Sequence, residues 1–492
     1  MIKKVGFFLL LSFIFPHIGI ENAYFEGNIG PYASRIIIEP PGIVPGLATI
    51  RVFSIDNKIK KVMVRPNHYD ASIKDTLSTF LLNPEEANKS DAIDNLFYSE
   101  LWLMAYGAYG IEIFLDGDEG EAKITIPVNS LSFKLIEMSF FMKIILFSLL
   151  LLLYFGAINI VSIAYSHSTL DADQKLTMHK KNKIIFIRIF ATVIITFFIY
   201  LGYNWWLSIE KQFIDRLYKP YATVSKVSGN TLNLKIESPS IESSWIDIQG
   251  TIREHGKIIT EHKKWSHIYI FDKEKSKYMA HIHPMLVDDY EFESCLPPMD
   301  AGEYLLYADV IHEDGYSHSI SSNFHINSSI DNKNYNSGLC DKDNSYAKLE
   351  ETNNNFTIKW SNKKDTYNTN DDINFQFKIL NGSELVELDT YVSMGSHAVI
   401  LNAEEEFYMH LHPLGSISMS AQKKFMGDES DSFICDFGVI EDEYGNYKVL
   451  DGMGQISFPS LNLKPGSYLF YIQVKIKETQ DILTKKFNFI VL

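Results

Sequence analysis

Two kinds of hydrophobic pattern divide this chain of 492 residues. Short runs in which apolar and polar residues alternate, as in half-buried β-strands, fill residues 24–134 and much of the chain after residue 224. Two long apolar stretches lie between them, at residues 144–165 and 184–207. Each has the ~20 residues that a membrane-spanning helix needs. The pattern predicts a mainly β protein with two transmembrane helices.

Residues 24–134 are predicted to form one exported β-sandwich. Residues 35–39 and 48–53 are β-branched runs separated by prolines and glycines. Residues 111–115 and 122–126 alternate on either side of an acidic turn that contains two glycines. That arrangement predicts a β-hairpin, and several such short strands suit a sandwich.

Charges near the apolar stretches predict how the chain lies in the membrane. Residues 1–23 carry Lys3 and Lys4 ahead of an apolar run, as a secretory signal does. The loop at residues 166–183 holds four lysines, and the positive-inside rule places it in the cytoplasm. Both terminal regions are then expected outside a bacterial inner membrane. Residues 208–223 are predicted to extend the second helix, because their apolar positions keep helical spacing.

The second half of the chain contains an internal repeat. Residues 266–285 read SHIYIFDKEKSKYMAHIHPM, and residues 396–414 read SHAVILNAEEEFYMHLHPL. Later strands also correspond, since AGEYLLYADV at residues 301–310 answers PGSYLFYIQV at residues 465–474. The chain therefore carries two copies of one β domain.

We predict that each copy is a β-sandwich of immunoglobulin-like or cupredoxin-like shape. The first sandwich is expected at residues 224–327 and the second at residues 355–492. Residues 328–354 are rich in asparagine, aspartate, serine and lysine, a composition typical of a mobile linker.

The repeated segments predict two β-hairpins that carry histidines. Their symmetry places His267 opposite His281 in the first hairpin, and His397 opposite His410 in the second. Cross-strand partners share a face of a sheet, and so do residues two apart on one strand. Each hairpin should therefore gather three imidazoles on one face: His267, His281 and His283 in the first copy, and His397, His410 and His412 in the second.

Three imidazoles within reach of one another are a candidate metal site. Imidazole suits copper and zinc, whereas a thioether favours Cu(I). Met279 precedes His281 by two residues and should share its face, so it is a further candidate ligand. The alternative is structural, because histidines near a strand end also hydrogen-bond backbone carbonyls, with the following proline protecting the sheet edge. The residues leave both interpretations open. His312, His318 and His325 are expected at the surface.

Composition and missing motifs narrow the functional classes. The formal net charge of −16 would repel phosphate backbones, so nucleic acid is not an expected partner. The three cysteines, Cys295, Cys340 and Cys435, lack zinc-finger spacing, and a Cys295–Cys340 disulfide is one pairing that the sequence leaves undecided. No nucleophile elbow, HExxH motif or phosphate-binding glycine loop is present, so we expect no enzyme.

The pattern of a histidine, about a dozen residues, H-x-H-P and a later G-x-Y strand resembles the exported domains called YtkA-like. Those domains are related in shape to cupredoxins and are often encoded near copper-handling functions. The whole layout, with PPG-x-VPG at residues 40–46 ahead of two spans and H-x-H-P domains, also resembles a group of bacterial membrane proteins. The resemblance implies a copper-related or structural exported domain, and it implies no reaction.

These observations predict a membrane-anchored envelope protein that binds a transition metal, copper before zinc, for handling or delivery to an envelope partner. The alternative is a non-catalytic interaction scaffold whose H-x-H-P histidines are structural. A metal-dependent hydrolase is a third hypothesis, and it would need an open coordination position beside a pocket.

Overall fold

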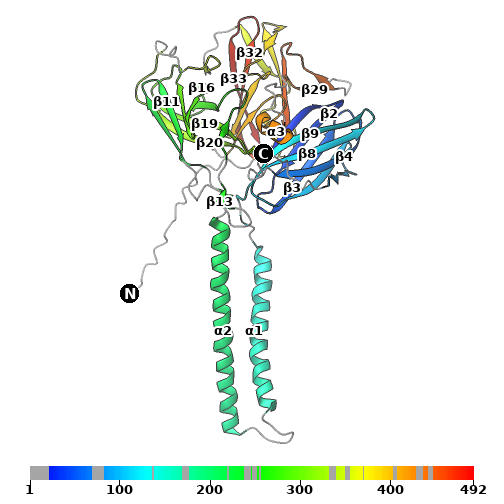
Figure 1. The fold of residues 1–492 in the computed structure, drawn as a ribbon, viewed down its shortest axis with the longest axis vertical. Helices are drawn as coiled ribbons and strands as arrows, with labels where there is room; N and C mark the ends of the chain where they lie inside the picture. Colours follow the sequence, from blue (N-terminus) through cyan, green and yellow to red (C-terminus); the bar gives the residue numbers. More distant parts are fainter. Residues whose placement is uncertain are drawn as a thin grey trace. The chain divides into compact units, whose positions relative to one another are not determined.

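The computed structural model divides the chain into two compact units, residues 1–133 with 218–492, and residues 134–217 (Figure 1). It describes residues 22–68, 83–133, 135, 138–168, 177–215, 217–218, 221–237, 245–246, 252–253, 256–331, 340–349, 355–369, 371–402, 407–427, 436–441 and 447–492. The first unit is built from β-sheets and the second from two helices. The predicted mainly β fold is confirmed.

The N-terminal part of the first unit is a two-sheet β-sandwich. One sheet has the order β1-β2-β3-β7-β6 and the other the order β5-β4-β8-β9. The predicted hairpin is β8–β9, with Ile111 opposite Ile126. The strands are β1 (Ala23–Ile29), β2 (Tyr32–Glu39), β3 (Gly46–Ser54), β4 (Ile59–His68), β5 (Glu85–Glu86), β6 (Asn88–Lys89), β7 (Leu96–Leu103), β8 (Gly107–Gly117) and β9 (Gly120–Ser130).

Repeat 1, the first histidine-bearing domain, is a second sandwich. Its sheets have the orders β10-β11-β18-β17 and β14-β19-β15-β16-β21, with β20 also paired to β19, and β12 and β13 form a separate pair. The strands are β10 (Thr223–Ser228), β11 (Thr231–Ile236), β12 (Trp245–Ile246), β13 (Ile252–Arg253), β14 (Ile258–Ile259), β15 (His267–Asp272), β16 (Tyr278–Ile282), β17 (Met285–Asp288), β18 (Glu291–Cys295), β19 (Gly302–His312), β20 (Ser317–Ile326) and β21 (Ser345–Lys348).

Repeat 2 repeats this plan and adds one short helix. Strands β22, β24, β25 and β31 form one sheet, and the other has the order β23-β33-β32-β27-β28, with β26 paired to β32. The elements are β22 (Phe356–Trp360), β23 (Thr366–Tyr367), β24 (Ile373–Asn381), β25 (Glu384–Leu385), β26 (Leu388–Asp389), β27 (His397–Asn402), β28 (Tyr408–Leu411), α3 (Met419–Met426), β29 (Val439–Glu441), β30 (Tyr447–Val449), β31 (Gln455–Leu461), β32 (Gly466–Ile476) and β33 (Ile482–Val491).

The histidine hairpins are covered on both faces. In β15, Ile268 and Ile270 belong to the core of repeat 1, so the pleat turns His267, Tyr269 and Phe271 to the opposite face. That face packs against repeat 2 through a fourth apolar cluster. We call it the interface cluster, and its buried members are Tyr269, Phe271, Met279, Tyr307, Val399, Leu401, Tyr408 and Tyr471.

The N-terminal sandwich packs against both repeats. Tyr24 and Ile37 belong to the core of repeat 2, whereas Ala108 and Leu131 belong to the core of repeat 1. Backbone bonds join Glu26 N to Leu414 O at 2.9 Å, and Ser416 N to Tyr24 O at 3.1 Å. The three sandwiches therefore belong to one packed unit, and experiments on the site need the whole chain.

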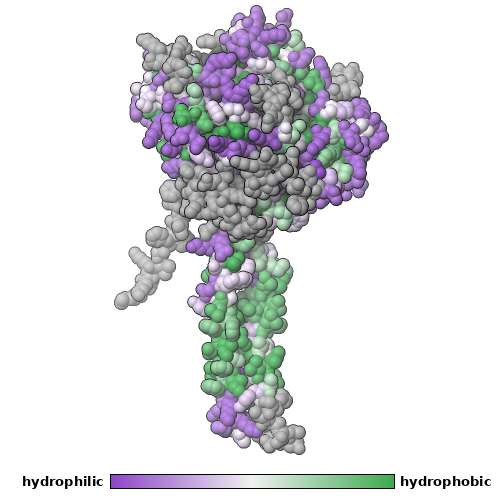
Figure 2. Space-filling view, viewed as in Figure 1, coloured by the Kyte–Doolittle hydropathy of each residue, from purple (hydrophilic) through white to green (hydrophobic). Residues whose placement is uncertain are grey.

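The second unit consists of two long apolar helices, α1 (Phe140–Ser168) and α2 (Met178–Asp215). Each contains an 18-residue stretch apolar enough to span a membrane, with mean hydropathies of 2.6 and 2.5, and Figure 2 shows apolar side chains along both helices. Arg188 donates from Nε to Ser162 Oγ at 3.0 Å, so this cation in α2 is partnered by a hydroxyl of α1. The two helices are suited to anchor the chain in a membrane.

The structure corrects two expectations between the domains. The predicted linker 328–354 contains strand β21, which pairs with β16, and Cys340 within it forms a disulfide with Cys295. A polar composition did not exclude order, because an edge strand of repeat 1 and a disulfide hold this segment. The helical extension also stops at Asp215, and β10 begins at Thr223 within the predicted 208–223 helix. The predicted signal segment, apart from its last two residues, and Cys435 lie outside the described residues.

Candidate metal centre

The histidine hairpins form, but their register differs from the predicted one. Tyr269 is opposite His281, and Val399 is opposite His410. The predictions had placed His267 and His397 at those positions. Each pairing is shifted by two residues, and a shift by two keeps every side chain on its face. The turns are one residue further along than the symmetry of the sequence suggested, yet the imidazoles still share one face.

The structure brings together the three predicted histidines of each repeat. We call His267, His281 and His283 triad 1, and His397, His410 and His412 triad 2. Within each triad, one possible ligand atom per residue lies within 4.8 Å of the others. His267 Nδ1 is 3.0 Å from His281 Nε2, and His397 Nδ1 is 3.1 Å from His410 Nε2. Two nitrogens bound to one metal at ~2.0–2.1 Å are separated by about 2.9 Å at a right angle and about 3.3 Å in a tetrahedron.

The two triads adjoin one another, which the sequence did not predict. The ring centroid of His397 is 5.5 Å from that of His267 and 5.3 Å from that of His281. Within the triads, the closest pairs of rings lie 4.5 Å apart. His262 adds a seventh imidazole, 5.1 Å from His412. Histidines of both repeats therefore form a single buried cluster.

Each repeat orients a histidine of the other. Gln473 on β32 accepts at Oε1 from His281 Nδ1 at 2.9 Å, and Asp309 on β19 accepts at Oδ2 from His410 Nδ1 at 2.9 Å. Asp309 is paired with His267 across β15 and β19, and Gln473 is paired with His397 across β27 and β32. Both bonds occupy Nδ1 and leave Nε2 facing its triad. This is the arrangement that fixes histidine tautomers at metal sites.

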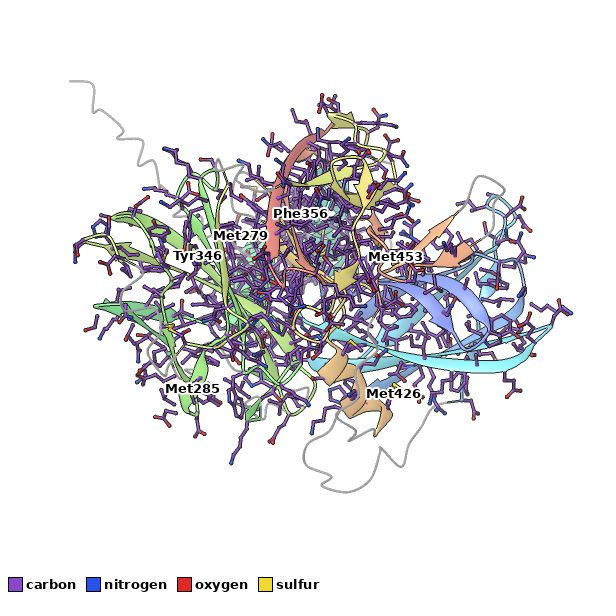
Figure 3. The ribbon with its side chains drawn as sticks, turned by 90° about the horizontal axis from the view of Figure 1, so that it is seen from above. Met279, Met285, Tyr346, Phe356, Met426 and Met453 are labelled. Atoms are coloured by element: carbon purple, nitrogen blue, oxygen red, sulfur yellow. A yellow bond between two sulfur atoms is a disulfide. The ribbon has the colours of Figure 1, made fainter. Side chains whose placement is uncertain are left out.

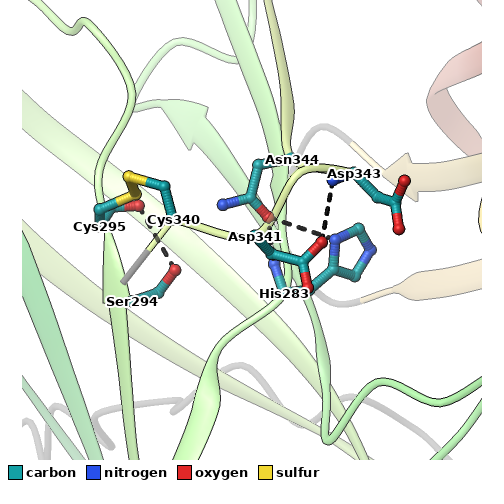
Figure 4. Close-up of a disulfide and its surroundings, with 7 residues drawn as sticks. All are labelled: His283, Ser294, Cys295, Cys340, Asp341, Asp343 and Asn344. Carbon is teal, nitrogen blue, oxygen red and sulfur yellow. Dashed lines mark hydrogen bonds between the residues drawn. A yellow bond between two sulfur atoms is a disulfide. The ribbon is translucent and has the colours of Figure 1, made fainter. Parts of the chain in front are cut away.

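Two further histidines are oriented by nearby backbone and amide groups. His397 Nε2 lies 3.0 Å from Tyr391 O, which leaves Nδ1 for the triad. His283 Nδ1 lies 3.2 Å from Asn344 Oδ1, and Asn344 follows the Cys295–Cys340 disulfide closely in the chain (Figure 4). The segment predicted to be a linker therefore helps to build triad 1.

The electrostatic environment keeps the imidazoles neutral. Burial lowers the pKa of His267, His281, His397 and His412 well below the ordinary value, and neighbouring imidazoles lower each pKa further. Burial, together with the Lys264 ammonium, lowers the pKa of His283 to about 3. Neutral imidazole is the form that binds a metal, so these groups are available as ligands without losing a proton.

Several imidazole nitrogens of the cluster have no hydrogen-bond partner. They are Nε2 of His267, Nε2 of His283, and both ring nitrogens of His412. A buried polar group without a partner costs about 1–3 kcal/mol, so a cluster of them needs an explanation. The structural alternative predicted bonds to backbone carbonyls. Among the described residues, His397 is the one triad histidine whose ring hydrogen-bonds a backbone carbonyl, that of Tyr391. The unpartnered nitrogens of His267, His283 and His412 are available to bind a metal ion.

Met279 has a packing environment in the structure. It lies opposite Phe271 on β15, is fully buried and belongs to the interface cluster. Figure 3 shows it where the green sheet of repeat 1 meets the red strands of repeat 2. Its role as a metal ligand stays a prediction.

A cavity of about 180 Å³ adjoins triad 2. Its lining includes His410 and His412 of triad 2, His267 of triad 1, and the carboxylates Glu261 and Asp309. The Glu261 carboxylate also accepts from Met419 N at 2.9 Å and Ser420 N at 3.1 Å, so it binds the N-terminus of α3. The side chain of His410 is 10% exposed, whereas His267, His281 and His397 are at most 1% exposed. Solvent therefore reaches the cluster from the triad 2 side.

The sequence analysis missed the residues that join the repeats. Asp309 and Gln473 occupy matching positions in AGEYLLYADV and PGSYLFYIQV, directly across from the first histidine of each triad. That shared position was the available signal. The signal for His262 was weaker: this residue lies in a turn before β15 that corresponds to the turn containing Val392 before β27.

The histidines expected at the surface are not all there. His312 is buried, and its Nε2 lies 3.1 Å from His318 Nε2. A carbonyl explains this burial, since His312 Nδ1 lies 2.7 Å from Gly256 O. His325 is exposed as expected and contacts Glu303 at 2.7 Å.

Comparisons with known proteins leave the chain without a family. No protein-family model matches it, and no curated protein does. Three solved structures give weak likenesses, each with a TM-score of 0.14. Fibronectin(III)-like modules of Clostridium thermocellum CbhA are 7% identical, over 55% of this chain and 94% of theirs. Dimeric latent PorU from Porphyromonas gingivalis is 8% identical, over 96% of this chain and 34% of its own, and the BSP domain of a biofilm-associated protein is 7% identical, over 93% and 81%. At this TM-score none of them bears on fold or function.

Proposed function

We propose that this protein is a membrane-anchored binder of a transition metal, copper before zinc, and that the two triads hold the metal. The single observation that carries the proposal is the buried, neutral histidine cluster in which nitrogens of three imidazoles have no hydrogen-bond partner. The orienting bonds from Asp309 and Gln473 support it, because they leave one nitrogen of each central histidine facing its triad.

Copper is preferred to zinc for two reasons. The triads offer neutral nitrogen donors without a carboxylate, and Cu(II) binds such ligands more tightly than Zn(II). The resemblance to YtkA-like domains, which implies either a copper-related or a structural exported domain, also favours copper over zinc. The two apolar helices support a role at a membrane. We propose the bacterial inner membrane, with both terminal regions on the outer side, and a role in handling or delivery without catalysis.

The test is the metal content of the full-length chain purified in detergent and dialysed against copper or zinc. We expect bound copper in stoichiometric amounts. A variant in which His281, His283, His410 and His412 are alanine should lose it. His325→Ala is the matched control, because His325 is exposed and lies outside the cluster. If the four-alanine variant keeps its metal, or the unaltered chain takes up none, the proposal is wrong and the scaffold hypothesis gains.

A further inference from the structure

We infer that the two triads hold two metal ions as one dinuclear centre shared by the repeats, an inference that rests on the proposed function. The six triad histidines do not form two separate sites. The ring of His267 is 5.2 Å from His281 in its own triad and 5.4 Å from His410 in the other. Rings of different triads therefore lie about as close together as rings of the same triad, so ions in the two triads must be close neighbours.

The number of ligands also suits two ions. Six imidazoles exceed what one tetrahedral copper or zinc ion binds, whereas three per ion leave each an open position. Sites with two metals place them ≈ 3.5–4 Å apart. The short nitrogen pairs lie within the triads, at 3.0 Å and 3.1 Å, and each pair defines one ion.

Both repeats are needed to form the centre, because each supplies a residue that orients a histidine of the other. Asp309 of repeat 1 orients His410, and Gln473 of repeat 2 orients His281. Tyr269 of repeat 1 also contacts His410, with its hydroxyl 2.8 Å from Nε2. Each ion therefore depends on side chains of both repeats.

The charges near the cluster fit a pair of monovalent ions. Buried charge is stable only where opposite charge accompanies it. Asp309 bonds a triad ligand directly, and Glu261 lies 3.3 Å from His262. These two carboxylates balance two Cu(I) ions. Both also line the cavity at triad 2, which gives a cation an acidic route into the centre.

The test loads the full-length chain in detergent with Cu(I) under anaerobic conditions and then oxidises it with ferricyanide. We expect two copper ions per chain. Their electron paramagnetic resonance signal should integrate to less than half of the copper, because two Cu(II) ions a few ångströms apart couple magnetically. The variant His410→Asn should bind one copper, whose signal integrates to the full amount.

Other results overturn the inference in distinguishable ways. One copper per unaltered chain, or two with the full signal of isolated ions, contradicts a dinuclear centre while leaving the proposed function intact. No copper above the level of the four-alanine variant contradicts the proposed function itself. Because His410→Asn can also disturb folding, its melting temperature without metal is measured alongside. His325→Ala serves as a second variant that keeps all six triad imidazoles and lies outside the cluster, and it should retain two coupled ions.

Discussion

Triad 1 and triad 2 are built on matching strands, yet different chemistry orients them. Gln473, a neutral amide, bonds the central histidine of triad 1, whereas Asp309, a carboxylate, bonds that of triad 2. Triad 1 is also attached to the disulfide-linked segment through Asn344, whereas triad 2 contributes two histidines to the lining of the cavity and triad 1 only His267. Hydrogen bonds to an ionised acceptor are roughly twice as strong as neutral ones. The two triads therefore share their type of ligand and differ in the groups that orient them, and triad 2 is the more exposed of the two at His410.

Removing ligands from one triad at a time should have the largest effect. The pair His281→Ala and His283→Ala should abolish the metal of triad 1, and His410→Ala with His412→Ala should abolish that of triad 2, each lowering the copper content by one ion per chain. The reason is that a single remaining imidazole cannot replace three ligands. Metal analysis after dialysis measures this, and His325→Ala should change nothing. Loss of both ions from either pair would mean that the triads bind only together.

Lowering the pH tests a property that both triads share, the neutrality of their buried imidazoles. In the metal-free protein, the folded pKa of the buried imidazoles is depressed, to about 3 for His283, against about 6.5 in an unfolded chain. Below pH 6.5 the unfolded state takes up protons that the folded state does not. The free energy of unfolding should therefore fall as the pH drops from 6.5 toward 3, by up to about 1.4 kcal/mol per pH unit for each such histidine. Urea unfolding between pH 7.5 and pH 5 measures it.

The matched control for acid is the four-alanine variant, which lacks three of the imidazoles with a depressed pKa and should show a shallower slope over the same pH range. Equal slopes for the two proteins would contradict neutral, buried histidines. Above pH 6.5 both states are unprotonated at these groups, so no such dependence is expected there.

Of the two triads, only triad 1 should lose metal affinity when the disulfide is removed. The pair Cys295→Ser and Cys340→Ser releases a loop of 45 residues and should lower the free energy of unfolding by about 2–4 kcal/mol. Because Asn344 lies just beyond Cys340, the copper affinity of triad 1 should fall as well. Urea unfolding and copper titration measure the two effects. An equal loss of affinity at triad 2 would show that the disulfide supports the whole cluster.

The orienting residues should give the smallest effects. Asp309→Asn should weaken the metal of triad 2 by about 10–100-fold, since second ligand shells contribute that much to affinity. Gln473→Ala should weaken the metal of triad 1 by a smaller factor, because the bond it removes is neutral. Competition with a copper chelator measures both. Glu303→Gln, which alters an exposed carboxylate on His325, is the control. A larger loss of copper affinity in Gln473→Ala than in Asp309→Asn would contradict the proposed difference between the triads.

The sequence was sufficient for the parts of the site that depend on strand pleating. His281 and His283 alternate with apolar residues, so any pairing shifted by two residues would still have placed them on one face with His267. The shift itself was not predictable, because it depends on turns whose charged residues permit several lengths. The linker was mistaken for a different reason, because Ser345–Lys348 gains its order from pairing with β16 and not from its own composition.

What the sequence could not give is the contact between the repeats. The apolar residues on both faces of β15 and β27 indicate burial, but they do not identify the partner surface. Tyr269 and Leu401 belong to one cluster only because the two repeats pack on their histidine faces. The proximity of the triads follows from that packing and from no local pattern.

The exchange of Asp309 and Gln473 between the repeats has a consequence for biogenesis. The chain is synthesised from residue 1 onward, so β32 and Gln473 leave the ribosome long after His281 and His283. A partly translated chain contains the imidazoles of repeat 1 but not yet Gln473, the residue that orients His281. Under the proposed function, the ion is captured only after translation has finished and both copies have closed on each other.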